Sequence, residues 1–273
     1  MFIFKMPINR CFFTANFIIL SKININDKMF VVICMERIQK VIANSGYTSR
    51  RKAEELLLKG KVKVNGIVIK ELGTMVDSSD TIEVEGHILK KNEKVYVLLN
   101  KPRGVVTTTS DDKHRKTVVD LIEIHTRIYP VGRLDYDTTG VLILTNDGEL
   151  TNGLTHPSSN ADKVYITKIK GLIKSEDLKK LSSGVIIDGK KTSKAKVKLK
   201  KIDKKKETSI VELTIHEGRN HQVKKMFEAI GYEVLKLKRE RFSFLDIKDL
   251  KPGEYRYLTI KEVKKLYSLI NNK

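Results

Sequence analysis

Two aspartates, Asp135 and Asp137, lie two residues apart in a segment bounded by Gly132 and Gly140. An apolar run at residues 141–144 follows directly, which predicts a tight loop that leads into a buried strand. A carboxylate held in such a loop can act as a nucleophile or as a base without a metal or a cofactor. The segment is therefore the first candidate for a catalytic site.

The same ten residues are compatible with other kinds of site. They begin like a calcium-binding loop, but the twelfth position, which should be acidic, is Asn146. They also match the Asp-x-Asp-x-Thr motif of haloacid-dehalogenase phosphatases, although Gly132 and Arg133 interrupt the buried strand that should precede that motif. A plain Asp-rich turn that satisfies its own backbone explains the segment as well, so the segment alone does not choose.

A second cluster of polar residues contains two histidines, His216 and His221, with Glu217 between them. The histidine spacing is one residue longer than in the zinc motif His-Glu-x-x-His. Gly218 also argues against a helix that would present both rings on one face. No metal and no cofactor are therefore expected.

The composition favours a polyanionic partner. Among 273 residues, 53 are Lys or Arg and 33 are Asp or Glu, which gives a formal net charge of +20. Such a surplus favours RNA or DNA, because neutralised phosphates release condensed counterions. A general lysine bias is the alternative. The lysines at residues 190–206 likewise form either a solvated hairpin face or a phosphate-contacting edge.

The first 34 residues differ from the remainder. They contain both cysteines, Cys11 and Cys34, so disulfides and cysteine metal sites are excluded beyond them and a reducing cytoplasm is expected. The apolar run at residues 11–20 is too short to cross a bilayer, which needs about 20 residues. We expect residues 1–34 to be a disordered extension or the product of an upstream start site, with a membrane anchor as the alternative.

Residues 35–86 predict a small domain of two helices and a sheet. Helices are expected over 36–46 and, after a Ser49 cap, over 50–59. An Asn-Gly turn within residues 61–69 predicts a hairpin, and a further strand is expected at 81–84.

Three cations, Arg50, Arg51 and Lys52, occupy the first turn of the second predicted helix, where the helix dipole favours acids. This placement indicates a docking anion, or else a solvated helix start. Residues 48–53 and 60–66 resemble the S4 (alpha-L) RNA-binding domain, which implies that the cations contact RNA.

Beyond a polar linker at residues 87–94, residues 95–273 predict a second domain. Hairpins dominate there, and regular strand–helix alternation is missing, so an α+β fold with a largely antiparallel sheet is expected. Strands are predicted at 95–99, 141–145, 165–173, 195–200, 209–216, 234–237 and 255–258, and helices at 118–122, 149–154, 220–230 and from about 261.

Six motifs in this second domain, in the same order along the chain, resemble RsuA/RluB-type pseudouridine synthases. They lie at residues 100–105, 129–135, 144–150, 155–157, 163–165 and 216–226. Members of this family also carry an N-terminal S4 domain. The resemblance implies an isomerase that converts a uridine of ribosomal RNA to pseudouridine after base flipping. The likeness to the RluB branch favours a uridine of large-subunit RNA.

The resemblance also implies roles for individual residues. Asp135 matches the catalytic aspartate, and Tyr165 matches the aromatic residue that stacks on the target base, although a tyrosine in a strand is more often part of a core. Arg133 is expected to hold phosphate or the place of the flipped nucleotide. Lys224 stands where the family usually has an arginine that pairs with the aspartate, and Arg219 is the alternative for that role or a phosphate contact. Asp137 is expected to shape the loop.

The predicted RNA-binding residues of both domains are Arg50, Arg51, Lys52, Lys101 and Arg103. The expected partner is ribosomal RNA or a pre-ribosomal particle, bound by a cytoplasmic monomer that needs no membrane. The alternative from another class is a non-catalytic RNA-binding ribosome assembly factor.

Overall fold

The computed structural model describes residues 24–25, 28–29, 35–90, 92–156, 159 and 161–271. It divides into two compact units, residues 1–93 and 94–273. Within residues 1–34 only two short paired strands are described, β1 (Asn24–Ile25) and β2 (Lys28–Met29). The expectation for the other residues of that segment lies outside the described residues. No helix in the described part of the chain is long and apolar enough to cross a membrane.

Two helices of the first unit pack together, α1 (Ile38–Asn44) and α2 (Arg50–Leu58). The side chain of Ser49 accepts a hydrogen bond from the Lys52 amide and caps α2, as the sequence predicted. The apolar faces of both helices pack on a small sheet in one core.

That small sheet has the order β5-β4-β7-β8. The predicted Asn-Gly hairpin is confirmed, since Asn65 and Gly66 both have positive φ angles, 50° and 83°. Residues 87–88 form the edge strand of this sheet, so the first unit extends into the expected linker. The strands are β4 (Val62–Val64), β5 (Ile67–Ile69), β7 (Ile82–Val84) and β8 (His87–Ile88), with β3 (Glu36–Arg37) and β6 (Met75–Val76) paired separately.

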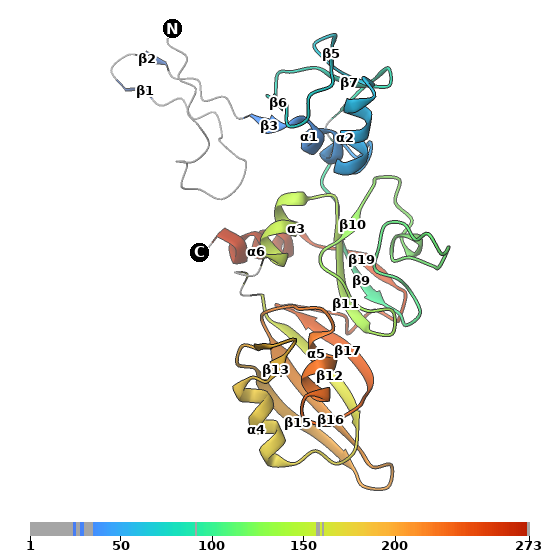
Figure 1. Cartoon of the computed structure of the whole chain (residues 1–273), viewed down its shortest axis with the longest axis vertical. Coiled ribbons are helices and arrows are strands. Elements are labelled where there is room, and N and C mark those ends of the chain that lie inside the picture. Colours follow the sequence, from blue (N-terminus) through green and yellow to red (C-terminus); the bar gives the residue numbers. More distant parts are fainter. Residues whose placement is uncertain are drawn as a thin grey trace. The chain divides into compact units, whose positions relative to one another are not determined.

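The second unit is built on one large sheet with the strand order β15-β16-β12-β17-β11-β9-β19 (Figure 1). All pairings are antiparallel except a short parallel one between β11 and β17. The expected α+β class with a largely antiparallel sheet is confirmed. The strands are β9 (Tyr96–Lys101), β10 (Tyr129–Pro130), β11 (Thr139–Thr145), β12 (Lys163–Lys170), β15 (Lys196–Asp203), β16 (Thr208–Ile215), β17 (Val234–Phe242), β18 (Leu245–Asp246) and β19 (Tyr255–Tyr257).

Helices cover different parts of the two sheet faces. On one face α4 (Ser175–Ser183) and α5 (Gln222–Glu228) pack on a core that includes buried residues of β12, β16 and β17. On the other face α3 (Gly148–Thr155) and α6 (Ile260–Asn271) pack on β9 and β11. The helix expected at 118–122 is a single 3-10 turn, η2 (Val119–Leu121), and a small hairpin joins β13 (Ile186–Ile187) to β14 (Lys190–Lys191).

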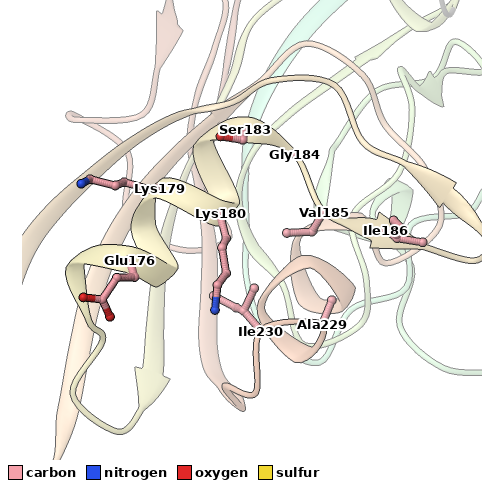
Figure 2. A pocket seen from close by; sticks show the side chains of 9 residues that line it. All are labelled: Glu176, Lys179, Lys180, Ser183, Gly184, Val185, Ile186, Ala229 and Ile230. Carbon is pink, nitrogen blue, oxygen red and sulfur yellow. The ribbon is translucent and has the colours of Figure 1, made fainter.

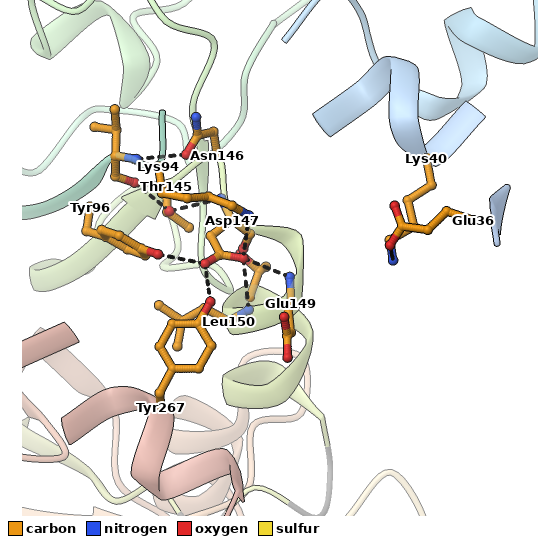
Figure 3. Close-up of polar contacts among 12 residues, drawn as sticks. Glu36, Lys40, Lys94, Tyr96, Thr145, Asn146, Asp147, Glu149, Leu150 and Tyr267 are labelled. Carbon is orange, nitrogen blue, oxygen red and sulfur yellow. Dashed lines mark hydrogen bonds and ion pairs between the residues drawn. The ribbon is translucent and has the colours of Figure 1, made fainter. Parts of the chain in front are cut away.

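A buried carboxylate, Asp147, links α3 to its surroundings (Figure 3). It caps α3 and accepts hydrogen bonds from Tyr96 at 2.7 Å, from Lys94 at 2.9 Å and from Tyr267 of α6. Burial alone would raise the pKa of Asp147, but these donors lower it below its usual value. The carboxylate therefore stays charged and joins β9, α3 and α6.

Candidate active site

The loop between β10 and β11 presents Asp135 to helix α5. The side chain of Asp135 is 28% exposed, and each of its carboxylate oxygens faces a different side chain. Lys224 Nζ lies 3.3 Å from Oδ2, and His221 Nε2 lies 3.5 Å from Oδ1. Both partners come from the 216–226 motif, so the structure brings together two segments that are about 85 residues apart in the sequence.

Lys224 also contacts the second acid of the loop. Its Nζ lies 2.6 Å from Oδ1 of Asp137, closer than to Asp135. Burial alone would lower the pKa of Lys224, but the hydrogen bond to Asp137 and the two negative charges raise it. Burial would raise the pKa of Asp137, but Lys224 and the charge of Arg103 lower it. Asp137 therefore does more than shape the loop, because it shares the lysine.

A buried lysine, Lys101, supports the backbone of the loop that carries Asp135. Its ammonium donates to backbone carbonyls at 3.0–3.5 Å, those of Pro102, Asp135, Tyr136 and Thr138. Burial lowers the pKa of Lys101 to about 8, although the charges of Asp135 and Asp137 oppose this shift. Lys101 is 0% exposed, so the expected contact with RNA is wrong.

Other residues near Lys101 complete this support. Thr107 Oγ1 donates to the Leu134 carbonyl at 2.6 Å, and the amide of Gly104 donates to the Tyr136 carbonyl at 2.8 Å. The segment at residues 101–107 therefore clamps the backbone on both sides of Asp135. A carboxylate fixed in this way is preorganised for reaction.

The strand after the loop approaches β17 very closely. A β-carbon at Gly140 would lie 2.2 Å from the carbonyl oxygen of Arg239, so only glycine fits there. The Arg239 side chain is buried and donates from Nε to the Val141 carbonyl at 2.8 Å. These contacts fix the point where the loop enters the sheet.

Tyr165 lies on β12 and is 8% exposed. It packs in the same core cluster as Leu134 and Val223, the residues that directly precede Asp135 and Lys224. The strand register places Tyr165 opposite Arg239, which pairs on its other side with Gly140 at the end of the Asp135 loop. Its contact with a target base stays a prediction.

Lys163, the first residue of β12, supports the segment that precedes α5. Its Nζ donates to the His216 carbonyl at 2.6 Å and so ties β12 to the loop that precedes α5. Burial lowers the pKa of Lys163 to about 8.

Arg219 does not pair with Asp135 among the described residues. Its guanidinium donates to the carbonyls of Lys190 and Lys191 at 3.1 and 2.9 Å and contacts Glu217 at 3.4 Å. The alternative that Arg219 serves as the partner of the aspartate is therefore wrong, because Lys224 takes that place and Arg219 fastens the loop to β14. Its second expected role, a phosphate contact, stays a prediction.

The other expected RNA contacts lie on exposed side chains. Arg133 and Arg103 are exposed on the loops around Asp135. In the first unit Arg50, Arg51 and Lys52 are exposed at the start of α2, and Lys52 is paired with Glu55 at 3.0 Å. These five assignments stay predictions.

In the residues that the structure describes, no three His, Cys, Asp or Glu side chains are grouped so that they could hold a metal ion. An open hollow of about 550 Å³ lies along α4 and beside the end of α5, and it contains none of the predicted site residues (Figure 2). Its lining consists of Glu176, Lys179, Lys180, Ser183, Gly184, Val185, Ile186, Ala229 and Ile230.

Sequence reasoning missed the place of His221, which it weighed only as a zinc ligand. The signal was present in the three-residue spacing from His221 to Lys224, which places both at the start of one helix. His221 adopts a left-handed conformation with φ of 52°, directly before α5.

Comparisons with known proteins find matches for both units of the chain. A model of the RNA pseudouridylate synthase family matches residues 95–229, and a model of the S4 domain matches residues 36–82. The chain is 56% identical to the ribosomal large subunit pseudouridine synthase B of Bacillus subtilis, over 87% of this chain and 98% of that protein. An uncharacterized RNA pseudouridine synthase of Aquifex aeolicus is 39% identical over 87% of this chain and 96% of its own length. A crystal structure of a pseudouridylate synthase, 33% identical, matches with a TM-score of 0.60 over 84% of this chain and 99% of that one.

Proposed function

The chain belongs to the RNA pseudouridylate synthase family and is an isomerase of this class, and from this premise we propose that it modifies a uridine of large-subunit ribosomal RNA, with Asp135 as its catalytic residue. The single observation that carries the residue assignment is the carboxylate of Asp135, held between Lys224 and His221. The name of the Bacillus subtilis relative supports the choice of large-subunit RNA.

The reaction is an isomerisation with a simple balance. The bond between N1 of uracil and C1′ of ribose breaks, and a bond between C5 and C1′ forms. C5 loses a proton and N1 gains one, so no oxidant, reductant or co-substrate is consumed. The protein has to supply a carboxylate, a place for the rotating base and a route for one proton.

Asp135 is suited to the first task. Its carboxylate is partly exposed, and its backbone carbonyl is fixed by the buried ammonium of Lys101. Lys224 neutralises part of the negative charge of the two loop acids, which lowers the cost of bringing an anionic RNA near them. The aspartate serves as a nucleophile or a base, and neither role needs a metal.

Tyr165 is suited to the second task, because it pairs with Arg239 of β17, the residue that also pairs with Gly140 at the end of the Asp135 loop. We assign it the stacking contact with the target base. A uridine in a loop or bulge is the expected target, because base flipping costs a few kcal/mol of unstacking.

RNA affinity comes from other surfaces. We assign phosphate contacts to the exposed cations Arg133 and Arg103 near the site, and to the start of α2 in the S4 domain. We propose that the protein acts as a monomer. A ribosomal RNA substrate, free or in a pre-ribosomal particle, supports a cytoplasmic location for the activity.

The proposal is tested by mapping pseudouridines in ribosomal RNA from cells with and without the gene. We expect one pseudouridine of the large-subunit RNA to disappear on deletion and to return with the wild-type gene but not with the Asp135→Asn variant. A ribosome assembly defect with an unchanged pseudouridine map would instead identify a non-catalytic assembly factor. Loss of a position in small-subunit RNA would overturn the choice of substrate.

A further inference from the structure

The half of the large sheet formed by β15, β16, β12 and β17 has two unequal faces. Helices α4 and α5 pack on the face that contains Tyr165, Leu213 and Leu237, all of which are buried. On the opposite face, in the residues that the structure describes, the side chains of Ile166, Ile210 and the neighbouring lysines are partly or fully exposed. An antiparallel sheet can leave one face in water, so exposure alone is ordinary.

The strand register places many lysines on this uncovered face. One cross-strand row runs Lys198, Glu212, Ile166, Lys238, and the next runs Lys201, Ile210, Lys168, Lys236. Together with two further lysines of β15 they form a surface that we call the basic sheet face, made of Lys168, Lys196, Lys198, Lys200, Lys201, Lys236 and Lys238.

The charges on this face are poorly balanced. Lys168 and Lys236 are direct cross-strand partners, a like-charge arrangement that is unfavourable in an isolated sheet. Within the described residues, only two lysines of the basic sheet face are in ion pairs, Lys200 with Glu212 at 3.3 Å and Lys238 with Glu240 at 2.8 Å. The protein therefore holds cations together at a cost to its own stability.

Protection of a sheet edge explains only part of this pattern. Lysines on an edge strand prevent pairing with other chains, and β15 is an edge strand. However, Lys168 and Lys236 lie on β12 and β17, which are interior strands with neighbours on both sides. A surface that binds an extended polyanion accounts for the lysines of all three strands.

The basic sheet face is separated from Asp135 by the sheet itself. Lys224 contacts Asp135 from α5, and the neighbouring residues Val223 and Met226 pack on the opposite face. Phosphates next to the target uridine are therefore not the ones that reach the basic sheet face. Any RNA bound there is a second segment, remote from the modified position.

We propose that the basic sheet face binds the sugar–phosphate backbone of a second segment of the substrate RNA. Lysines two residues apart on one strand are spaced by about 6.6–6.8 Å and present charge without reading bases. A large folded RNA can engage both faces at once, whereas a short stem-loop reaches only the face of Asp135. The inference rests on RNA being the substrate of the proposed function, and it does not depend on the chemical step.

The test compares two triple variants of the full chain. One removes three lysines of the face, Lys168→Gln, Lys198→Gln and Lys236→Gln. The matched control removes the same charge at exposed lysines elsewhere in the second unit, Lys179→Gln, Lys251→Gln and Lys264→Gln. Filter binding measures the Kd for a long domain of large-subunit RNA and for a short stem-loop that contains the target, each across a range of KCl concentrations.

For the long RNA, we expect the face variant to bind more weakly and to lose about 2–3 from the slope of log K against log salt, close to one per phosphate contact. For the stem-loop, it should behave like the control. Equal effects of both variants, or no change in the slope for long RNA, would overturn the proposal.

Two further readouts keep the result interpretable. Removal of the Lys168–Lys236 repulsion should leave the Tm unchanged or raise it. With such a Tm, weaker RNA binding by the face variant is not the result of unfolding. Pseudouridine formation is scored separately. If the face variant changes the salt slope but the wild type forms no pseudouridine, the binding face is supported and the isomerase proposal is refuted. If the wild type forms pseudouridine but the face variant leaves the salt slope unchanged, the isomerase proposal is supported and the binding face is refuted.

Discussion

The ammonium of Lys224 lies 3.3 Å from a carboxylate oxygen of Asp135, and this contact joins the start of α5 to the loop that precedes β11. The same ammonium lies 2.6 Å from Asp137, so one cation serves two acids. The acids are thus partly neutralised before RNA arrives, which lowers the cost of bringing phosphates near them.

Loss of this cation should reduce catalysis. We expect Lys224→Met to lower kcat by about 10²-fold, the usual cost of one preorganised electrostatic contact. Lys224→Arg should retain most activity, because a guanidinium fork can contact both acids. Steady-state kinetics on an RNA transcript measure kcat, and a Met variant as fast as the wild type would contradict the role.

The pH dependence gives an independent check on Lys224. Its pKa is raised, so its charge persists at neutral pH and is lost only above the ordinary lysine value of 10.5. Any loss of activity between pH 7 and 9 should therefore be the same in the wild type and in Lys224→Arg.

His221 should make a smaller contribution than Lys224. Its Nε2 lies 3.5 Å from Asp135, a long contact from a half-exposed ring. We expect His221→Asn to lower kcat by about tenfold, the equivalent of one modest hydrogen bond. Asparagine tolerates the left-handed backbone of this position, so α5 should keep its start. A fall as large as that of Lys224→Met would instead assign His221 an essential role.

The two lysines with lowered pKa values predict how stability changes with pH. Lys101 and Lys163 titrate near 8 in the folded protein and near 10.5 when unfolded. Between these values the unfolded state binds more protons, so the free energy of unfolding rises with pH, by up to about 1.4 kcal/mol per pH unit for each lysine. Below pH 8 both states are protonated and the rise ends.

Substitution of one lysine at a time distinguishes the contribution of Lys101 from that of Lys163. Urea unfolding from pH 7.5 to 10 should show a smaller rise in Lys101→Met and, equally, in Lys163→Met. The Lys101 variant should also lose activity, because the carbonyls around Asp135 lose their donor. An unchanged pH slope in both variants would contradict the burial of these charges.

Asp147 should be essential for stability. Removing one partner of a buried ionic network costs about 3–5 kcal/mol, so we expect Asp147→Asn to lower the free energy of unfolding by about that amount. Because its pKa is lowered, this contribution is present above the ordinary value of 3.8 and is lost as pH falls through the folded value. Tyr96→Phe and Tyr267→Phe, which remove one donor each, should cost about 1.5–3 kcal/mol. Thermal unfolding measures all three, and a Tm of Asp147→Asn equal to the wild-type value would contradict the network.

Much of the fold follows from local patterns in the sequence. The hairpin at Asn65 and Gly66, the Ser49 cap and the alternating strands of residues 196–215 all depend on neighbours in the chain, and each is present. Helix α4 (Ser175–Ser183) was missed, because its polar sequence has few apolar positions and its packing on the sheet decides its conformation.

The candidate site was less predictable, because its contacts are long-range. No local pattern shows that Lys101 is buried under the loop of Asp135, since a lysine beside a turn is usually solvated. The place of His221 similarly depends on how α5 docks against a loop about 85 residues earlier. The sequence motifs identified the segments that form the site, whereas the contacts between their side chains depend on the tertiary structure.

The central claim is that the carboxylate of Asp135 carries the reaction. Asp135→Asn keeps the shape of the side chain and removes its charge, while Asp137→Asn makes the same change two residues away and keeps one acid beside Lys224. The measurement is pseudouridine formation in a large-subunit RNA transcript, with RNA affinity measured in parallel. We predict no detectable product from Asp135→Asn at wild-type RNA affinity, and substantial product from Asp137→Asn. Full turnover by the Asp135→Asn variant would contradict the account.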